Sequence, residues 1–120
     1  MSSYNNAVTV IGNVGRDAEL KEIEGIGSVA KFPLAVYRSG KGDSAKTDWF
    51  YIECWHDVAR GAVESCRKGA KVIVFGSMKF DQYEKDGQKQ TRTSLVAKEI
   101  GKDISVAKDD SGEAGVDDPF

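Results

Sequence analysis

Cysteine, proline and histidine are scarce in this chain of 120 residues, which holds two cysteines, two prolines and one histidine. Cys54 and Cys66 could pair, but two thiols in a chain without a secretory signal are ordinarily reduced packing residues. His56 has no cluster of Cys, His or carboxylate residues at ligand spacing around it. We therefore expect no metal site and no cofactor.

Long apolar runs are also missing. No segment approaches the roughly 20 apolar residues needed to cross a bilayer. Residues 1–6 have neither the basic start nor the apolar stretch of a secretory signal. The sequence predicts a soluble, cytoplasmic protein with no membrane partner.

Patterns that indicate catalysis are absent as well. The sequence shows no grouping of nucleophile, base and orienting residue and no paired-carboxylate motif. The segment 12–15, Gly-Asn-Val-Gly, follows an apolar run, but it lacks the third glycine and the lysine of phosphate-binding loops. We expect that the protein is not an enzyme.

Charge is unevenly distributed along the chain. All 17 lysines and arginines lie at or before Lys108, and five acidic residues follow it. Residues 1–108 therefore hold 17 basic and 14 acidic residues, a net charge of +3. A mildly basic body with an acidic end is typical of a protein that binds a polyanion and interacts through its tail.

Apolar residues recur with a period of two over most of the chain, which indicates strands. The sequence predicts a first strand over 8–14 that bends at Gly12 and Gly15 and continues over 18–23, and a second over 30–36, where Pro33 indicates an edge or a bulge. Residues 39–46 are small and polar with two lysines, so they form either a mobile arm over a phosphate backbone or a plain hairpin loop.

The segment 46–55 is the most informative. As a strand it places Phe50, Ile52 and Cys54 on one face, which suits a core, and three large aromatics with Glu53 on the other. Such a row of aromatics is typical of a partly exposed binding platform. The aromatics are Trp49, Tyr51 and Trp55.

A short helix is predicted over 58–68, with Asp57 as its N-cap and Gly69 as its stop. Strands over 71–83 and 90–100 follow, joined by an Asp-Gly turn at 86–87 into a long hairpin. This order predicts an all-β domain over 1–104, a five-stranded Greek-key barrel of the OB type with one short helix, although an open sandwich also fits. Residues 105–120 have no periodicity and are predicted to form a disordered acidic tail.

Exposed aromatics at this spacing can stack on the bases of a single strand, whichever bases these are. The candidates are Trp49, Tyr51, Trp55, Phe80 and Tyr83; on a regular strand the last two lie on opposite faces. The tryptophans could instead close the barrel end or a subunit interface. The candidate phosphate contacts are Lys21, Arg38, Lys46, Arg67, Lys68, Lys71, Lys79 and Arg92.

Four segments in order along the chain resemble the bacterial single-stranded DNA-binding proteins. They are Val10-Ile11-Gly12-Asn13-Val14-Gly15-Arg16-Asp17, Thr47-Asp48-Trp49-Phe50, Arg67-Lys68-Gly69, and the end Asp117-Asp118-Pro119-Phe120. The resemblance implies an OB fold, commonly a homotetramer, around which single-stranded DNA wraps during replication, recombination and repair in the nucleoid. It also favours Tyr83 over Phe80 as a stacking residue, beside Trp49 and Trp55.

The resemblance also assigns a role to the acidic tip, and the sequence departs from the family pattern at several positions. It implies that the tip Asp117, Asp118, Pro119 and Phe120 docks into replication and repair proteins, with the ring and terminal carboxylate as anchors. Asp118 stands where an aliphatic residue is common, and Asp57 where some members have a lysine. The end of the second strand lacks a tryptophan that well-known members carry, for which either Tyr37 or Arg38 could substitute.

Two other classes of binding protein use a similar fold. A cold-shock-like RNA-binding module would use the same aromatic face but would prefer RNA and lack the Pro-Phe end. A protein-interaction adaptor would bury Trp49 and Trp55 in a subunit interface, where oligonucleotides could not reach them.

Overall fold

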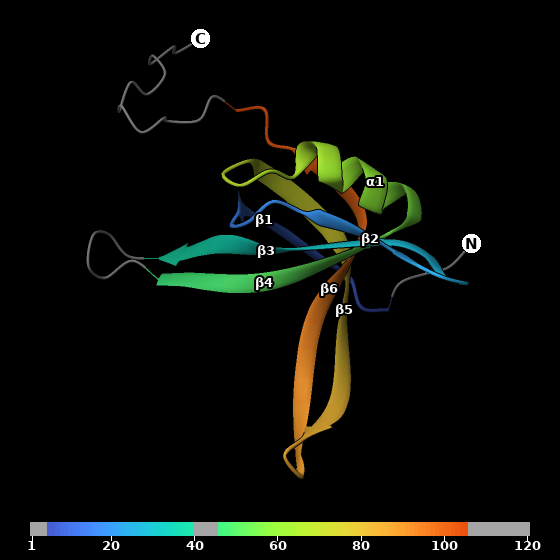
Figure 1. The fold of residues 1–120 in the computed structure, drawn as a ribbon. Coiled ribbons are helices and arrows are strands. Elements are labelled where there is room, and N and C mark those ends of the chain that lie inside the picture. The colour runs from blue at the N-terminus through green and yellow to red at the C-terminus, as the bar shows by residue number, and fades with distance from the viewer. Residues whose placement is uncertain (1–4, 40–45, 106–120) are drawn as a thin grey trace.

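The computed structural model describes residues 5–39 and 46–105, which form one sheet and one helix (Figure 1). Its elements in chain order are β1 (Val8–Val14), β2 (Glu19–Ile23), β3 (Gly27–Ser39), β4 (Lys46–Trp55), α1 (His56–Ser65), β5 (Lys71–Lys85) and β6 (Gln88–Lys102). Residues 40–45 of the segment 39–46, predicted as an arm or a hairpin loop, and residues 106–120 of the predicted tail 105–120 lie outside the described residues.

The strands follow the order β1-β5-β6-β4-β3-β2, and an additional pairing between β1 and β3 closes the sheet on itself. Neighbouring strands are antiparallel except for β4 and β6, which pair in parallel. β1 and β2 together are the segment expected as one bent strand: β1 pairs with the second half of β3, and β2 with its first half. The fold is the predicted all-β, OB-type architecture.

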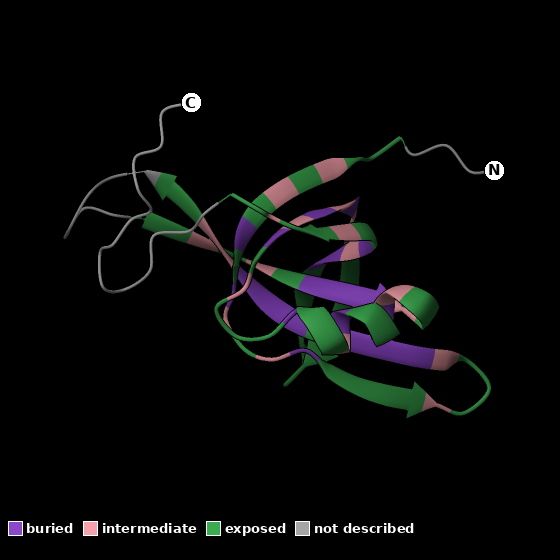
Figure 2. Cartoon of the chain, turned by 90° about the horizontal axis from the view of Figure 1, so that it is seen from above, coloured by how far each residue is buried: buried purple, intermediate pink, exposed green. Residues whose placement is uncertain are grey.

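The interior of the barrel is filled mainly by residues of β1, β3, β4, β5 and β6, whereas β2 contributes no buried residue. Figure 2 shows the buried positions concentrated along the strands of the barrel. The largest fully buried side chains include Phe32, Leu34, Ile52 and Leu95. Phe50, Ile52 and Cys54 all pack in or against this core, as the alternation along 46–55 predicts. Both cysteines are buried and free.

The predicted bounds and N-cap of the helix are wrong. The helix spans His56–Ser65 instead of 58–68, so Asp57 lies in its first turn and makes no cap; it pairs with Arg60 instead. Lys68 and Gly69 form a turn closed by the Ala70 N–H, which donates to the Arg67 carbonyl, and Gly69 has a φ of 93°, a conformation that glycine adopts without strain.

Pro33 lies neither on an edge nor at a bulge. It is paired with Tyr51 on β4, and the register shift of β3 falls later, between Tyr37 and Ser39. On its other side, β3 passes from pairing with β2 to pairing with β1, and the Pro33 carbonyl accepts a bond from the Gly15 N–H at 2.9 Å. A residue without an N–H is tolerated at this gap in the pairing.

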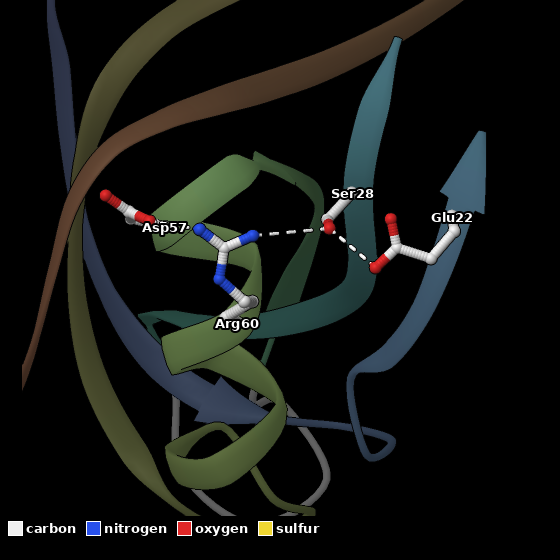
Figure 3. A network of polar contacts seen from close by, with 4 residues as sticks. All are labelled: Glu22, Ser28, Asp57 and Arg60. Atoms are coloured by element: carbon white, nitrogen blue, oxygen red, sulfur yellow. Dashed lines mark hydrogen bonds and ion pairs between the residues drawn. The ribbon is translucent and has the colours of Figure 1, made fainter. Parts of the chain in front are cut away.

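A polar network attaches α1 to the β2–β3 hairpin (Figure 3). The buried Ser28 hydroxyl donates to Glu22 Oε2 at 2.7 Å and accepts from Arg60 Nη1 at 3.4 Å. Arg60 also pairs with Asp57. The network thereby connects three elements at the helix-covered end of the barrel.

The β5–β6 hairpin continues well beyond the barrel as a two-stranded ribbon (Figure 1). Its turn is at Asp86 and Gly87, with φ values of 53° and 80°, which is the left-handed geometry expected for an Asp-Gly hairpin turn.

No described helix is long and apolar enough to cross a membrane.

Candidate nucleic-acid interface

Exposed aromatics line the outer face of β3 and β4. Trp49 and Tyr51 are 54% and 59% exposed, and Trp55 is partly buried further along the strand. Tyr37 reaches the same face from β3, because its register partner is Thr47, two residues before Trp49. We call Tyr37, Trp49, Tyr51 and Trp55 the aromatic face.

Trp49 lies against the backbone of the loop between β1 and β2. A Cβ atom added at Gly15 would stand 2.7 Å from Trp49 Cζ3, which is closer than real contacts allow, and 3.1 Å from Cη2, which is a tight contact. The same point is 3.5 Å from Pro33 Cγ. Gly15 and Pro33 therefore form a shallow seat for the indole ring, and only glycine at position 15 leaves room for it.

Trp55 is held by a carboxylate. Its Nε1 donates to Glu53 Oε2 at 2.7 Å, and Lys79 Nζ donates to the same oxygen at 3.0 Å. Glu53 is only 6% exposed. The hydrogen bond from Lys79 to Glu53 is the main cause that raises the Lys79 pKa above its ordinary value.

The projecting hairpin extends the aromatic face. Its register is regular from Gly76 to Lys85, so Lys79 and Tyr83 lie on one side and Phe80 on the other. Because Lys79 contacts Glu53, the side of Tyr83 is the side of the aromatic face. Tyr83 stacks with Arg92, whose guanidinium carbon lies 4.8 Å from the ring centroid. Phe80 is 64% exposed on the opposite side.

Two hollows adjoin each other, and Tyr51 of the aromatic face lines the first of them. The first, about 460 Å³, is lined among others by Tyr51, Arg92 and the buried Ser94. The second, about 480 Å³, includes Lys21. Arg16 and Lys31 line both hollows. The two hollows therefore meet at a pair of cations.

Arg16 and Lys31 were not among the candidate phosphate contacts. The position of Lys31 on the outer face could be predicted, because residues alternate between the two faces around the buried Phe32. In the structure Lys31 lies directly opposite Glu53 in the β3–β4 register. Arg16 could not be placed from spacing, since it belongs to the loop between β1 and β2.

The eight candidate phosphate contacts occupy different electrostatic settings. Four are paired with carboxylates in the described part of the chain: Arg38 with Asp48 at 3.4 Å, Arg67 with Asp17 at 3.3 Å, Lys71 with Asp103 at 3.4 Å, and Lys79 with Glu53 and Asp81. Lys21 and Arg92 line the hollows, and Lys46 and Lys68 are exposed. Of the two residues considered for the missing tryptophan, Tyr37 lies on the aromatic face and Arg38 does not.

No group of three or more His, Cys, Asp or Glu residues that could hold a metal ion occurs within residues 5–39 and 46–105. His56 packs beside Trp55, with ring centroids 6.1 Å apart, and against Gly27. The tip residues Asp117, Asp118, Pro119 and Phe120 lie outside the described part.

Comparison with known proteins gives a consistent result. The chain matches the model of the Single-strand binding protein family over residues 5–103. It is 33% identical over 109 residues to single-stranded DNA-binding protein 1 of Synechocystis, covering 91% of this chain and 90% of that protein. It is 29% identical over 110 residues to the single-stranded DNA-binding protein of Mycobacterium tuberculosis, covering 86% and 67%.

Solved structures share the fold. The small single-stranded DNA-binding protein from Streptomyces coelicolor superposes with a TM-score of 0.69 at 25% identity, covering 84% of this chain and 97% of that one. The Plasmodium falciparum protein solved in complex with single-stranded DNA gives a TM-score of 0.70 at 25% identity, covering 84% and 95%.

Proposed function

This chain belongs to the single-strand binding protein family, and from that membership we propose that it binds single-stranded DNA without base preference, through the aromatic face and Tyr83. The observation that supports this most strongly is the row of exposed rings on the outside of a closed barrel, with cations beside it. The related Plasmodium falciparum protein was solved in complex with single-stranded DNA.

Stacking supplies affinity without sequence selection. Each base stacked on an aromatic ring contributes roughly 1 to 3 kcal/mol, and every base has such a face. Along β4, successive positions among Trp49, Tyr51 and Trp55 are about 7 and about 13 Å apart at about 3.3 Å rise per residue, a spacing that suits different bases of one splayed strand. Duplex DNA cannot use the same rings, since its bases are already stacked. The proposed function involves no catalysis.

Phosphates would lie along the two hollows. Arg16 and Lys31 stand where the hollows meet, with Arg92 and Lys21 on either side. Arg38, Arg67, Lys71 and Lys79 are already paired with carboxylates, so they must break or share those ion pairs to bind phosphate. We therefore rank the four cations of the hollows above them as phosphate contacts. Lys46 and Lys68 remain candidates at the margins.

We further propose that the protein acts in DNA replication, recombination and repair as a homo-oligomer, with a tetramer expected. An apolar patch on the outer side of β1 and β5 supports association: Ile11, 48% exposed, is paired with Ile73, and Phe75 follows two residues later.

The acidic tip 117–120 is proposed to recruit partner proteins, with Phe120 as the anchor and the aspartates as steering charges. The tip belongs to a tail, residues 105–120, that we propose lies outside the DNA-binding domain.

The test is a titration with poly(dT) while tryptophan fluorescence is followed, because Trp49 and Trp55 are the only two tryptophans. We expect strong quenching by the single strand, none by a duplex, and weaker but persistent binding at high salt. Alanine at Trp49 or Trp55 should reduce both quenching and affinity. A chain ending at residue 115 should keep DNA binding and lose capture of partner proteins.

Tyr83→Ala and Phe80→Ala form a matched pair on one strand. Tyr83→Ala should weaken binding by about five- to tenfold, the lower end of the contribution of one stacked base, and Phe80→Ala should change it less than twofold. No quenching by poly(dT) would overturn the proposal and favour the adaptor interpretation. Tighter binding of poly(rU) than of poly(dT) would favour the RNA-binding interpretation.

A further inference from the structure

Glu53 is out of place on a surface for a polyanion. It lies in the row of Trp49, Tyr51 and Trp55, yet a carboxylate there repels phosphates, and burying it to 6% exposure is costly unless it is well bonded. The side chain can hold such a position only through the groups that bond to it.

Both groups that bond Glu53 belong to the proposed binding surface. Trp55 Nε1 and Lys79 Nζ donate to the same oxygen, Oε2, at 2.7 Å and 3.0 Å. The first bond fixes the rotation of the indole, because an indole has a single N–H and that N–H must point at the carboxylate. The second neutralises the carboxylate, so that it repels phosphate less.

The pair formed by Glu53 and Lys79 also crosses the sheet. β4 and β5 are not neighbours, because β6 lies between them. On β6 the residue opposite Lys79 is Ser94, which is small and buried, so the Lys79 side chain can pass over it to Glu53. Beyond this point the hairpin leaves the barrel and carries Tyr83. The ion pair therefore ties the root of the hairpin to the strand that carries the tryptophans.

We propose that Glu53 is a positioning residue of this surface: its carboxylate holds the Trp55 ring in one orientation and anchors the hairpin that carries Tyr83. The consequence for DNA binding rests on the proposed function, whereas the orientation of Trp55 does not. Two separate measurements can therefore test the two parts.

The first measurement needs no DNA. In a Trp49→Phe background Trp55 is the only emitter, and its anisotropy and its quenching by acrylamide report how firmly it is held. Glu53→Ala should lower the anisotropy and raise acrylamide quenching at least twofold. Glu53→Gln should stay close to the parent, because its amide oxygen still accepts the indole bond.

Two controls separate positioning from general damage to the fold. In a Trp55→Phe background, Glu53→Ala should leave the signal of Trp49 unchanged. Asp81→Ala removes the other carboxylate next to Lys79 without touching the indole, so Trp55 should also stay unchanged. Equal anisotropy and quenching of Trp55 in parent and Glu53→Ala would overturn the inference, as would an equal change at Trp49.

The second measurement is a double-mutant cycle on the affinity for a fluorescein-labelled dT oligomer. Glu53→Ala should weaken binding about five- to tenfold when Trp55 is present and less than threefold when Trp55 is already alanine. Strictly additive losses would overturn the positioning role. If the parent itself does not bind the oligomer, the proposed function fails while the spectroscopic result for Trp55 still stands or falls by itself.

Discussion

Gly15→Ala is a single-methyl test of the proposed Trp49 stacking site. Gly15 has an ordinary backbone conformation, so alanine fits the chain itself and the effect is confined to what the new methyl meets. It would meet the indole of Trp49, at 2.7 Å from Cζ3 where an ordinary contact starts at 3.4 Å. The ring must move outward by about 0.7 Å or swing away from its seat on Gly15 and Pro33.

The expected loss of DNA affinity follows from the stacking contribution of the Trp49 ring. Complete loss of one stacked base would cost about 1 to 3 kcal/mol, which is about five- to 150-fold in affinity. A displaced ring keeps part of its stacking, so the expected loss lies at the lower end, about three- to tenfold. Stability should change little, because Trp49 is 54% exposed and its ring can move outward into solvent.

Affinity is measured by titrating a labelled dT oligomer, and the emission of Trp49 is followed in a Trp55→Phe background. Gly61→Ala is the matched control: nothing lies within 4 Å of the added carbon, and an exposed helical position gains about 0.5 to 1 kcal/mol of stability from alanine. Gly61→Ala should leave affinity unchanged. If Gly15→Ala binds DNA as tightly as the parent, the Trp49 ring does not contribute to binding from the seat described above.

Two predictions concern stability. Burial raises the pKa of Cys54 to about 12 and that of Cys66 to about 11. Because these values exceed those of the unfolded chain, near 8.5, the free energy of unfolding should fall as pH rises from about 9 toward 11, by up to about 1.4 kcal/mol per pH unit for each thiol. Urea unfolding at several pH values checks this, and a Cys54→Ala, Cys66→Ala double variant should lose that part of the slope. Ser28→Ala should lower the free energy of unfolding by about 1 to 3 kcal/mol, since its buried hydroxyl makes two bonds; the control Ser65→Ala, at the exposed helix end, should change it by less than about 0.5 kcal/mol.

The strands and their faces could be predicted from the sequence because one physical signal dominates them. A half-buried strand alternates apolar and polar residues, and that alternation placed Ile52 and Cys54 inward and Trp49 and Tyr51 outward. The helix boundaries could not be predicted as well. Asp57 is a favourable N-cap, but β4 runs directly into the helix, so the first turn forms before Asp57 and its carboxylate pairs with Arg60.

The partners of the charged residues could not be read from the sequence. Alternation places Glu53 and Lys31 on the outer face but cannot show that Lys79, on a strand two positions away in the sheet, reaches Glu53. The seat of Trp49 on Gly15 depends on a contact between a loop and a strand 34 positions later, which also leaves no local pattern. Such contacts depend on the closed barrel as a whole.

The distribution of ion pairs indicates how the binding free energy should divide between stacking and charge. Four of the eight candidate cations are already neutralised by carboxylates, and the body of the chain has a surplus of only three positive charges. Each phosphate neutralised on a single strand contributes about −0.7 to the slope of log affinity against log salt. With Arg16, Lys21, Lys31 and Arg92 as contacts on one protomer, that slope is about −3. Stacking does not depend on salt in this way, so the aromatic face and Tyr83 account for the binding that persists when the cations are screened.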